Sequence, residues 1–386
     1  MIRSICSILP ALLSERGHEF VYQTSLRLAA EKIGLSHQAF LPVNSEILNS
    51  EIPNTWQKNL TPYIDNSKGN RLVALIKKVV NLPRLTFSVV KAMKKKPQEQ
   101  EEVLFFDCIS PVLFFWVTLS FLFVPRSQKS FWVMHRYPPT VLKSKGTLIK
   151  ITHTILRRMF KNRFVIFTDT ESLQKSLSDY FHQDVSILPV PHVHFESKEN
   201  IVSKFQGLPR SYVLWWPGEP REAKGKKILE KLLKVESEFN SKFKLVASKD
   251  SGFEALPKGL QVELVNSVLS REEYINWLNA CDFVILPYDR EVYKSSTSGI
   301  FIEAICAKKI PLVTSETWMA EELKKYGLEE LIIDWQNPNL FESLELLMQN
   351  DAVLEKLLKM KDAYQNIYGI ESMSVVMQQH VEALAA

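Results

Sequence analysis

The sequence predicts an α/β fold class, in which two Rossmann-like, doubly wound domains face a cleft. Three observations lead to this prediction. The chain has 386 residues, which is long for one hydrophobic core. Strand-like and helix-like segments alternate along both halves, as parallel sheets require. Hydrophobic residues make up 46% of the chain and the mean hydropathy is -0.08, as in ordinary globular proteins.

The first half of the chain predicts one sheet. Its strand-like runs are Ile2–Leu9, His37–Leu41, Val103–Asp107, Phe131–His135, Phe164–Thr168 and Val185–Pro189. The helical patterns between them include Phe20–Ile33, Leu72–Lys95 and Ile149–Phe160. The apolar segment Val112–Val124 would reach only about 20 Å as a helix, short of a bilayer core of about 30 Å. We therefore expect a buried helix there.

The second half predicts a second sheet. Its strand-like runs are Tyr212–Trp215, Lys244–Ala247, Val262–Leu264, Asp282–Leu286, Ile310–Val313 and Leu331–Ile333. Its helical patterns include Lys227–Phe239, Arg271–Ala280 and Glu316–Tyr326. The break Pro189–Pro191 and the polar stretch up to Pro209 mark the joint. We therefore expect an N-terminal domain over residues 1–200 and a C-terminal domain over residues 201–370.

The N-terminus and the cysteines favour a cytoplasmic protein. Residues Met1–Leu13 lack a convincing apolar core and a small-residue cleavage site, so a first strand fits them better than a signal peptide. None of the four cysteines has metal-like spacing, and we expect reduced, buried thiols at Cys6, Cys108, Cys281 and Cys306.

The segment Tyr293–Pro311 is the most informative part of the chain. It follows the strand-like run Cys281–Tyr288, and its Ser/Thr/Gly loop opens a helix that carries Glu303. Free backbone N–H groups and the helix dipole suit such a helix start to phosphate. Glu303, about one turn into the helix, could accept hydrogen bonds from sugar hydroxyls beside the phosphates.

A second segment, Tyr212–Gly225, joins a strand to a basic loop. Arg221 and Lys224 could neutralise the charge that develops on a leaving diphosphate. The alternative is a solvated, basic helix start, because Lys226 and Lys227 follow directly.

The segment Tyr293–Pro311 resembles the nucleotide-sugar loop of GT-B glycosyltransferases, especially those akin to glycosyltransferase family 4. That family carries a Glu, seven residues and a second Glu, then Ala, small residues and Pro, which match Glu303, Ala304, Ala307 and Pro311. Ser295 stands where the first Glu is expected. Some bacterial relatives carry instead a Tyr, a basic residue and a Ser-Gly pair, as in Tyr293, Lys294, Ser298 and Gly299.

The basic loop extends this resemblance. Lys224 and Gly225 correspond to the Lys-Gly pair that grips the donor diphosphate, and they precede the Ser-Gly loop by about 75 residues, as in the family. Glu219 occupies the usual Arg position, and the nearest Arg is Arg221. The resemblance implies that Arg221 and Lys224 are catalytic and that the donor-binding residues are Lys294, Thr297, Ser298, Gly299, Ile300 and Glu303.

The resemblance is looser in the first half. Gly17 and His18 open the first helix, with Tyr22 one turn on, and they could touch a sugar in the cleft or simply form a capping turn. His135 and Arg136 follow a strand, and ligands of open α/β sheets bind at strand carboxyl ends. The resemblance implies a catalytic role for His135 near the reacting sugar, and a place for Arg136 in the acceptor site or cleft.

The resemblance implies a hexosyltransferase-type enzyme of the GT-B fold. It would move a sugar from a nucleotide-diphosphate sugar to a glycan or lipid-linked acceptor, with retention of configuration. Its last helix, residues 371–386, would pack back onto the first domain. The sequence has no suitably placed Asp-x-Asp motif and no Cys/His cluster, so we expect no metal and no cofactor. The alternatives are a nucleotide-sugar epimerase and a non-catalytic GT-B scaffold that binds nucleotide sugar or a partner.

Charge is divided unevenly between the halves. Residues 1–200 hold 26 Lys and Arg against 16 Asp and Glu, a net +10, whereas residues 201–386 carry a net -5. Nine basic residues from Lys68 to Lys96 meet no acidic one, and apolar residues lie between them. Such a helix suits an anionic membrane surface, which predicts a cytoplasmic protein peripheral to the inner face of the membrane. The alternatives are a solubilising face and nucleic acid, but no nucleic-acid motif supports the latter.

Overall fold

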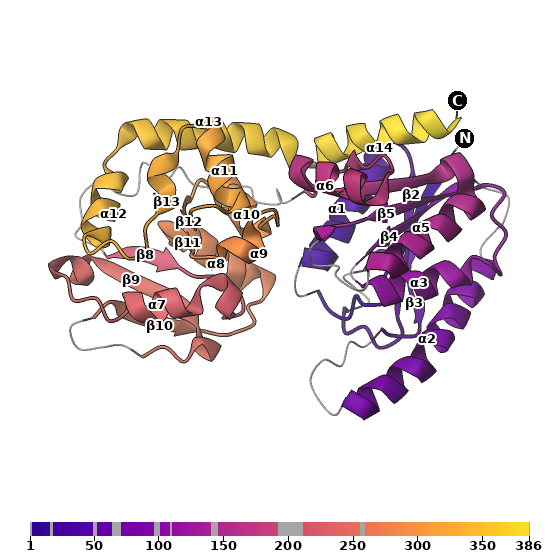
Figure 1. Ribbon diagram of the computed structural model, residues 1–386, viewed down its shortest axis with the longest axis horizontal. Helices are drawn as coiled ribbons and strands as arrows, with labels where there is room; N and C mark the ends of the chain where they lie inside the picture. Colours follow the sequence, from indigo (N-terminus) through magenta and orange to yellow (C-terminus); the bar gives the residue numbers. More distant parts are fainter. Residues whose placement is uncertain are drawn as a thin grey trace. The chain divides into compact units, whose positions relative to one another are not determined.

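The computed structural model describes residues 2–15, 18–48, 52–63, 71–95, 101–108, 110–139, 146–191, 211–254 and 259–385, without the side chains of residues 18, 71–79 and 385. The chain divides into two compact units. Unit 1 comprises Met1–Pro191 and Ile370–Ala386, and unit 2 comprises His192–Gly369. Most of the expected joint up to Pro209 lies outside the described residues. Figure 1 shows an α/β arrangement in each unit.

Unit 1 contains a seven-stranded parallel sheet in the order β3-β2-β1-β4-β5-β6-β7. Its strands are β1 (Ser4–Ile8), β2 (Ser36–Pro42), β3 (Trp56–Leu60), β4 (Glu102–Asp107), β5 (Lys129–Met134), β6 (Phe164–Thr168) and β7 (Ser186–Ile187). The strand β3 was not predicted, because its centre is the polar run Gln57-Lys58-Asn59, which an edge strand tolerates.

Two helical layers cover the sheet of unit 1. Apolar residues of α1 (His18–Lys32) and α14 (Ile370–Ala385) join one core with Phe105 and Trp132 of the strands. On the other face, Leu104 and Phe131 pack with α2 (Arg71–Lys94), α3 (Pro111–Ser120), α5 (Gly146–Phe160) and α6 (Glu171–Phe181). Successive strand residues therefore serve opposite layers, as the period of two requires.

Unit 2 contains a six-stranded parallel sheet in the order β10-β9-β8-β11-β12-β13. Its strands are β8 (Tyr212–Trp215), β9 (Phe243–Ser248), β10 (Gln261–Val265), β11 (Phe283–Leu286), β12 (Ile310–Thr314) and β13 (Ile332–Ile333). Its α-helices are α7 (Lys226–Leu232), α8 (Arg271–Ala280), α9 (Arg290–Tyr293), α10 (Gly299–Cys306), α11 (Trp318–Lys325), α12 (Leu340–Met348) and α13 (Asp351–Ile367). The two doubly wound sheets confirm the predicted fold class.

Two expected helices differ in extent. The predicted helix Lys227–Phe239 ends at Leu232, and a separate 3-10 turn begins at Glu238, where the Ser237 side chain accepts from the Phe239 backbone N–H. The segment Val112–Val124 is helical only to Ser120 and buries Leu113, Phe114 and Val117. Beyond its end, Leu122 and Phe123 are exposed.

Two further expectations concern the membrane and the thiols. No helix in the described ranges combines the length and apolarity needed to cross a membrane. The four cysteines are buried and form no disulfide, as predicted.

Candidate functional site

The loop between β11 and α10 presents a helix start. Ser298 is the N-cap of α10, and its side chain accepts a hydrogen bond from the backbone N–H of Phe301 at 3.3 Å. The first-turn amides of Gly299 and Ile300 have no intrahelical acceptor, as at every helix start. Thr297 is half-buried and Lys294 is exposed at the end of α9. The positive end of the α10 dipole thus coincides with the predicted phosphate-binding loop.

Glu303 lies one turn further into α10 and is almost completely buried, with 1% exposure. Its carboxylate is held by helix α8: the Tyr274 hydroxyl donates to Oε2, and Arg271 Nη1 lies 3.7 Å from Oε1. Burial, followed by the charge of Glu303, raises the pKa of Tyr274, so its phenol remains a donor. The sequence pattern had assigned no role to Tyr274 or Arg271.

Lys224 lies beside this helix start. A Cβ atom built on Gly218 would lie 2.9 Å from Lys224 Nζ and 3.9 Å from Ile300 Cδ1. Lys224 and Ile300, two of the predicted site residues, therefore both lie beside Gly218. Lys224 Nζ also lies 5.9 Å from the centre of the Tyr288 ring. The structure therefore brings Lys224 close to Ile300, in the first turn of α10.

The backbone explains how Lys224 reaches this position. Gly225 has φ +86°, and a Cβ there would lie 2.0 Å from the carbonyl oxygen of Pro287, which follows β11. Only glycine permits this approach of the basic loop to the end of β11. The Trp216 indole N–H donates to the Lys224 carbonyl at 3.1 Å and fixes the loop from the other side.

Two electrostatic features distinguish Lys224 from Arg221. Burial, followed by the nearby Arg221 charge, lowers the pKa of Lys224 to about 8. Arg221 is 64% exposed, and its Nε donates to Glu219 Oε2 at 2.9 Å. The exposed Arg221 is thus partly neutralised within its own loop, whereas Lys224 is the enclosed cation.

In unit 1, charged residues gather at the carboxyl ends of the strands. Asp107 ends β4, and its Oδ2 lies 3.0 Å from Nη2 of Arg136, which follows β5. The Arg136 guanidinium carbon lies 4.2 Å from the centre of the Tyr22 ring, and Tyr22 is 1% exposed. Although burial alone would lower the pKa of Arg136, the charges of Asp107, Tyr22, Asp169 and Glu19 raise it overall.

The carboxylates around Arg136 were not predicted from the sequence. Burial, followed by the charge of Asp107, raises the pKa of Glu19 to about 7. Burial also raises the pKa of Asp107, partly offset by Arg136. A signal was present, because Asp107 ends one strand-like run and Asp169 follows another, and the carboxyl ends of parallel strands lie at one edge of the sheet.

His135 lies apart from this group. Its Nε2 is 2.9 Å from Nε2 of His153 in α5, and the two rings pack against Phe114 and Phe181. Burial lowers the pKa of His135 to about 3, so its ring is neutral at pH 7. Strand alternation explains the separation from Arg136, whose side chain points to the opposite face. Gly17 and the His18 side chain lie outside the described residues, although α1 begins at His18.

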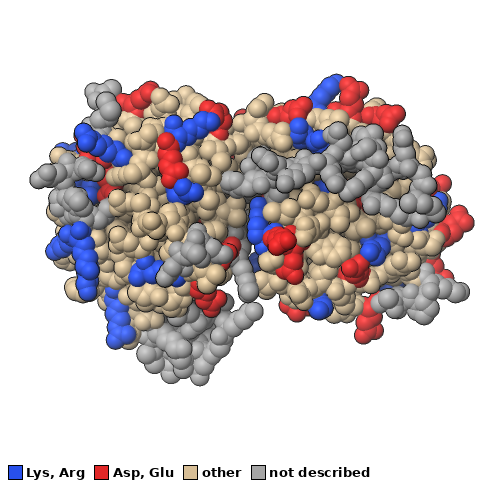
Figure 2. All heavy atoms as spheres, turned by 180° about the vertical axis from the view of Figure 1, so that it is seen from behind, with Lys and Arg blue, Asp and Glu red and all other residues tan. Residues whose placement is uncertain are grey.

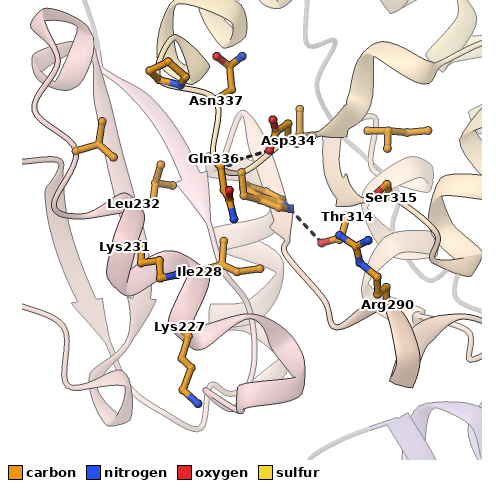
Figure 3. A pocket seen from close by; sticks show the side chains of 15 residues that line it. Lys227, Ile228, Lys231, Leu232, Arg290, Thr314, Ser315, Asp334, Gln336 and Asn337 are labelled. Atoms are coloured by element: carbon orange, nitrogen blue, oxygen red, sulfur yellow. Dashed lines mark hydrogen bonds between the residues drawn. The ribbon is translucent and has the colours of Figure 1, made fainter.

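A cavity of about 680 Å³ lies elsewhere in unit 2 (Figure 3). It is bounded by α7, Arg290, the ends of β12 and β13 and the loop to Pro338. Two of the residues that line it are joined by a hydrogen bond, in which the Trp335 indole N–H donates to Thr314 Oγ1 at 3.0 Å. None of the predicted donor-binding residues is among the described residues that line it.

Comparison with known proteins identifies the fold. No protein-family model and no curated protein matches the sequence. Solved structures do match over nearly the whole chain. The N-terminal domain of Candida albicans trehalose-6-phosphate phosphatase has a TM-score of 0.65 at 11% identity, with 99% of this chain and 97% of that one covered.

Two glycosyltransferase structures give similar values. A trehalose-6-phosphate synthase has a TM-score of 0.64 at 12% identity, covering 98% of this chain and 99% of that one. An alpha-glucosyltransferase in complex with UDP and DNA has a TM-score of 0.60 at 10% identity, with 99% of each chain covered. At such identities the likeness concerns the fold, and the chain has the GT-B architecture of these enzymes.

Proposed function

We propose that this protein is a glycosyltransferase that uses a nucleotide-diphosphate sugar and extends a glycan or a lipid-linked acceptor. One observation supports it above all: the enclosed Lys224 and the start of α10 meet beside Gly218, although they are far apart in the sequence. A half-buried cation and the first-turn amides of a helix are groups that stabilise a leaving diphosphate. The solved alpha-glucosyltransferase with the same fold holds UDP.

In the proposed reaction, unit 2 binds the donor. Lys224 and the amides of Thr297–Ile300 would bind the diphosphate, with Arg221 and Lys294 contributing from exposed positions. Glu303 would accept hydrogen bonds from the ribose. These groups supply the charge that a metal ion would otherwise provide, so we propose a metal-independent reaction. Retention of configuration is proposed from the resemblance to glycosyltransferase family 4.

Unit 1 would bind the acceptor. Asp107 and Glu19 are acceptors for sugar hydroxyls, and Arg136 is positioned by its ion pair with Asp107 and by the Tyr22 ring. We assign the acceptor site to this group. The catalytic role inferred for His135 stays a prediction. Its buried contact with His153 favours a structural role, in which it stabilises the packing of α5 against the end of β5.

The decisive experiment is product formation. Purified protein is incubated with labelled UDP-, GDP- or ADP-sugars and a glycan or glycolipid extract, with and without EDTA. We expect labelled acceptor together with release of nucleoside diphosphate, and EDTA should leave the rate largely unchanged. Nucleotide-sugar binding without either product would favour the non-catalytic scaffold, for which Ser295 and the Arg221–Glu219 pair are the supporting observations. Conversion of one nucleotide sugar into another would favour the epimerase.

We also propose that α2 attaches the protein to an anionic membrane. Its described outward residues include Arg84, Phe87, Lys91 and Lys94, with Phe87 70% exposed, and the exposed Lys95 follows its last residue. Exposed aromatic and basic side chains on one helix favour a lipid–water interface. On the face drawn in Figure 2, basic and acidic side chains are interspersed, so the proposal depends on α2 rather than on net charge. Lys68, Lys96 and the side chains of residues 71–79 lie outside the described part.

A further inference from the structure

Glu303 is oriented by a helix other than its own. Ser270 and Glu273 form a capping box that fixes the start of α8: the Ser270 backbone N–H donates to Glu273 Oε2 at 2.7 Å, and the Glu273 backbone N–H donates to Ser270 Oγ at 3.2 Å. Arg271 and Tyr274 are three residues apart on this helix, so they lie on one side. Both meet the Glu303 carboxylate.

Tyr274 can adopt few alternative positions. Its ring packs edge-on against Trp215, the last residue of β8, with ring centres 5.0 Å apart. Its hydroxyl donates to Oε2 of Glu303, which is itself 1% exposed. A phenol held by ring packing and bonded to one carboxylate oxygen restricts the orientation of that carboxylate.

The other carboxylate oxygen lies beside Arg271. Oε1 lies 3.7 Å from Arg271 Nη1, beyond hydrogen-bond range, and the Arg271 side chain is 40% exposed. A ligand would therefore approach Glu303 from the Arg271 side. Each carboxylate oxygen can accept more than one hydrogen bond, so Oε1 can bind a ligand hydroxyl in addition to its protein neighbours.

We propose that Tyr274 is a positioning residue that aims the Glu303 carboxylate at the ribose hydroxyls of the donor. This inference rests on the proposed function, in which Glu303 binds the ribose. It predicts that the preference for a ribonucleotide over its deoxy analogue depends on the Tyr274 hydroxyl, although that hydroxyl does not itself contact the ligand. The alternative is that Tyr274 only stabilises the packing of α8 against α10.

The test compares UDP, ADP and GDP with their 2′-deoxy and 3′-deoxy counterparts by calorimetric titration. We expect the wild type to bind at least one ribonucleotide about tenfold more tightly than a deoxy form, the discrimination that one good hydrogen bond provides. Tyr274→Phe keeps the ring packing, and it should lose most of this preference while binding the deoxy form within about twofold of the wild type. Glu303→Gln should lose the same preference.

A matched control exists in the same unit. Tyr364 in α13 donates from its hydroxyl to Glu322 Oε2 at 2.7 Å, which is also a mostly buried Tyr–Glu bond. Tyr364→Phe should lower the melting temperature about as much as Tyr274→Phe and leave the ribose preference intact.

The outcomes separate the two proposals. If Tyr274→Phe weakens ribonucleotide and deoxynucleotide equally, or keeps the preference, the positioning role is wrong and the proposed function stands. If the wild type binds nucleotides without preferring ribose, the positioning role is again wrong. If the folded wild type binds none of the three diphosphates, the proposed function fails and this inference with it.

Discussion

Lys224 is the residue on which the proposed chemistry depends most. Its charge matters most as the diphosphate departs, so Lys224→Ala should lower kcat by more than it weakens nucleoside binding. We expect a loss of about 100-fold in turnover, the range seen when one stabilising donor is removed. Arg221→Ala should act in the same direction and less strongly, because Arg221 is exposed and paired with Glu219. The control is Lys227→Ala, since that lysine is 76% exposed and pairs with Glu222.

The lowered pKa of Lys224 makes diphosphate binding dependent on pH. Below a pKa of about 8 the ammonium is charged, and above it the charge is lost. The affinity for a nucleoside diphosphate should therefore fall as the pH rises from 7 to 10, with a midpoint shifted upward by the bound anion. Lys224→Arg keeps its charge throughout this range. A variant that retained the wild-type pH profile would show that Lys224 is not the group responsible.

Glu19 predicts a pH dependence of stability in unit 1. Its pKa in the folded protein is about 7, above the ordinary 4.5, so folding favours the protonated form. That contribution is fully present below pH 4.5 and is lost as the pH rises through 7, at a cost of up to about 3 kcal/mol. Glu19→Gln should therefore raise the melting temperature at pH 8 relative to the wild type and have little effect at pH 4.5. Equal shifts at both pH values would contradict the assignment.

At the scale of single elements, α2 provides the test of membrane attachment. Each basic residue near an anionic bilayer contributes about 1 kcal/mol, so the protein should co-sediment with anionic liposomes at low salt and dissociate at high salt. Neutral liposomes should bind it poorly. Changing Lys91, Lys94, Lys95 and Lys96 to Glu should abolish sedimentation, whereas Lys324→Glu with Lys325→Glu on α11 should not. If the wild type ignores anionic liposomes at low salt, the basic run is only a solvated face.

Most elements could be predicted because buried parallel strands are continuous apolar runs. Strand β3 was not predicted, since an edge strand needs no continuous apolar run. The predicted length of α7 was too great, because no strong helix breaker follows Leu232. The segments around Lys224 and Ser298 were recognisable because each is local in sequence. Tyr274 was not, because its role arises from its contact with the distant Glu303. The place of Asp107 at a strand end was recognisable, but its ion pair with the distant Arg136 was not.

At the scale of the whole molecule, the two units divide the proposed work. Unit 2 holds the enclosed cation and the helix start suited to a diphosphate, and unit 1 holds a group of carboxylates around one guanidinium. In the proposed reaction the sugar would pass from a donor bound to unit 2 to an acceptor bound to unit 1. Donor binding is assigned to residues of unit 2 alone, so it can be measured before any acceptor is known.

The central claim is tested most directly by thermal denaturation with a panel of nucleotide sugars. A ligand that binds only the native state raises its stability, by about 2.7 kcal/mol at 100 times Kd. At least one nucleotide sugar should raise the melting temperature of the wild type. Glu303→Ala should fold normally and require at least about tenfold more of that ligand for the same shift, a loss of about 1.4 kcal/mol. If no nucleotide sugar shifts the wild type, or if folded Glu303→Ala responds like the wild type, the donor site is not where we place it.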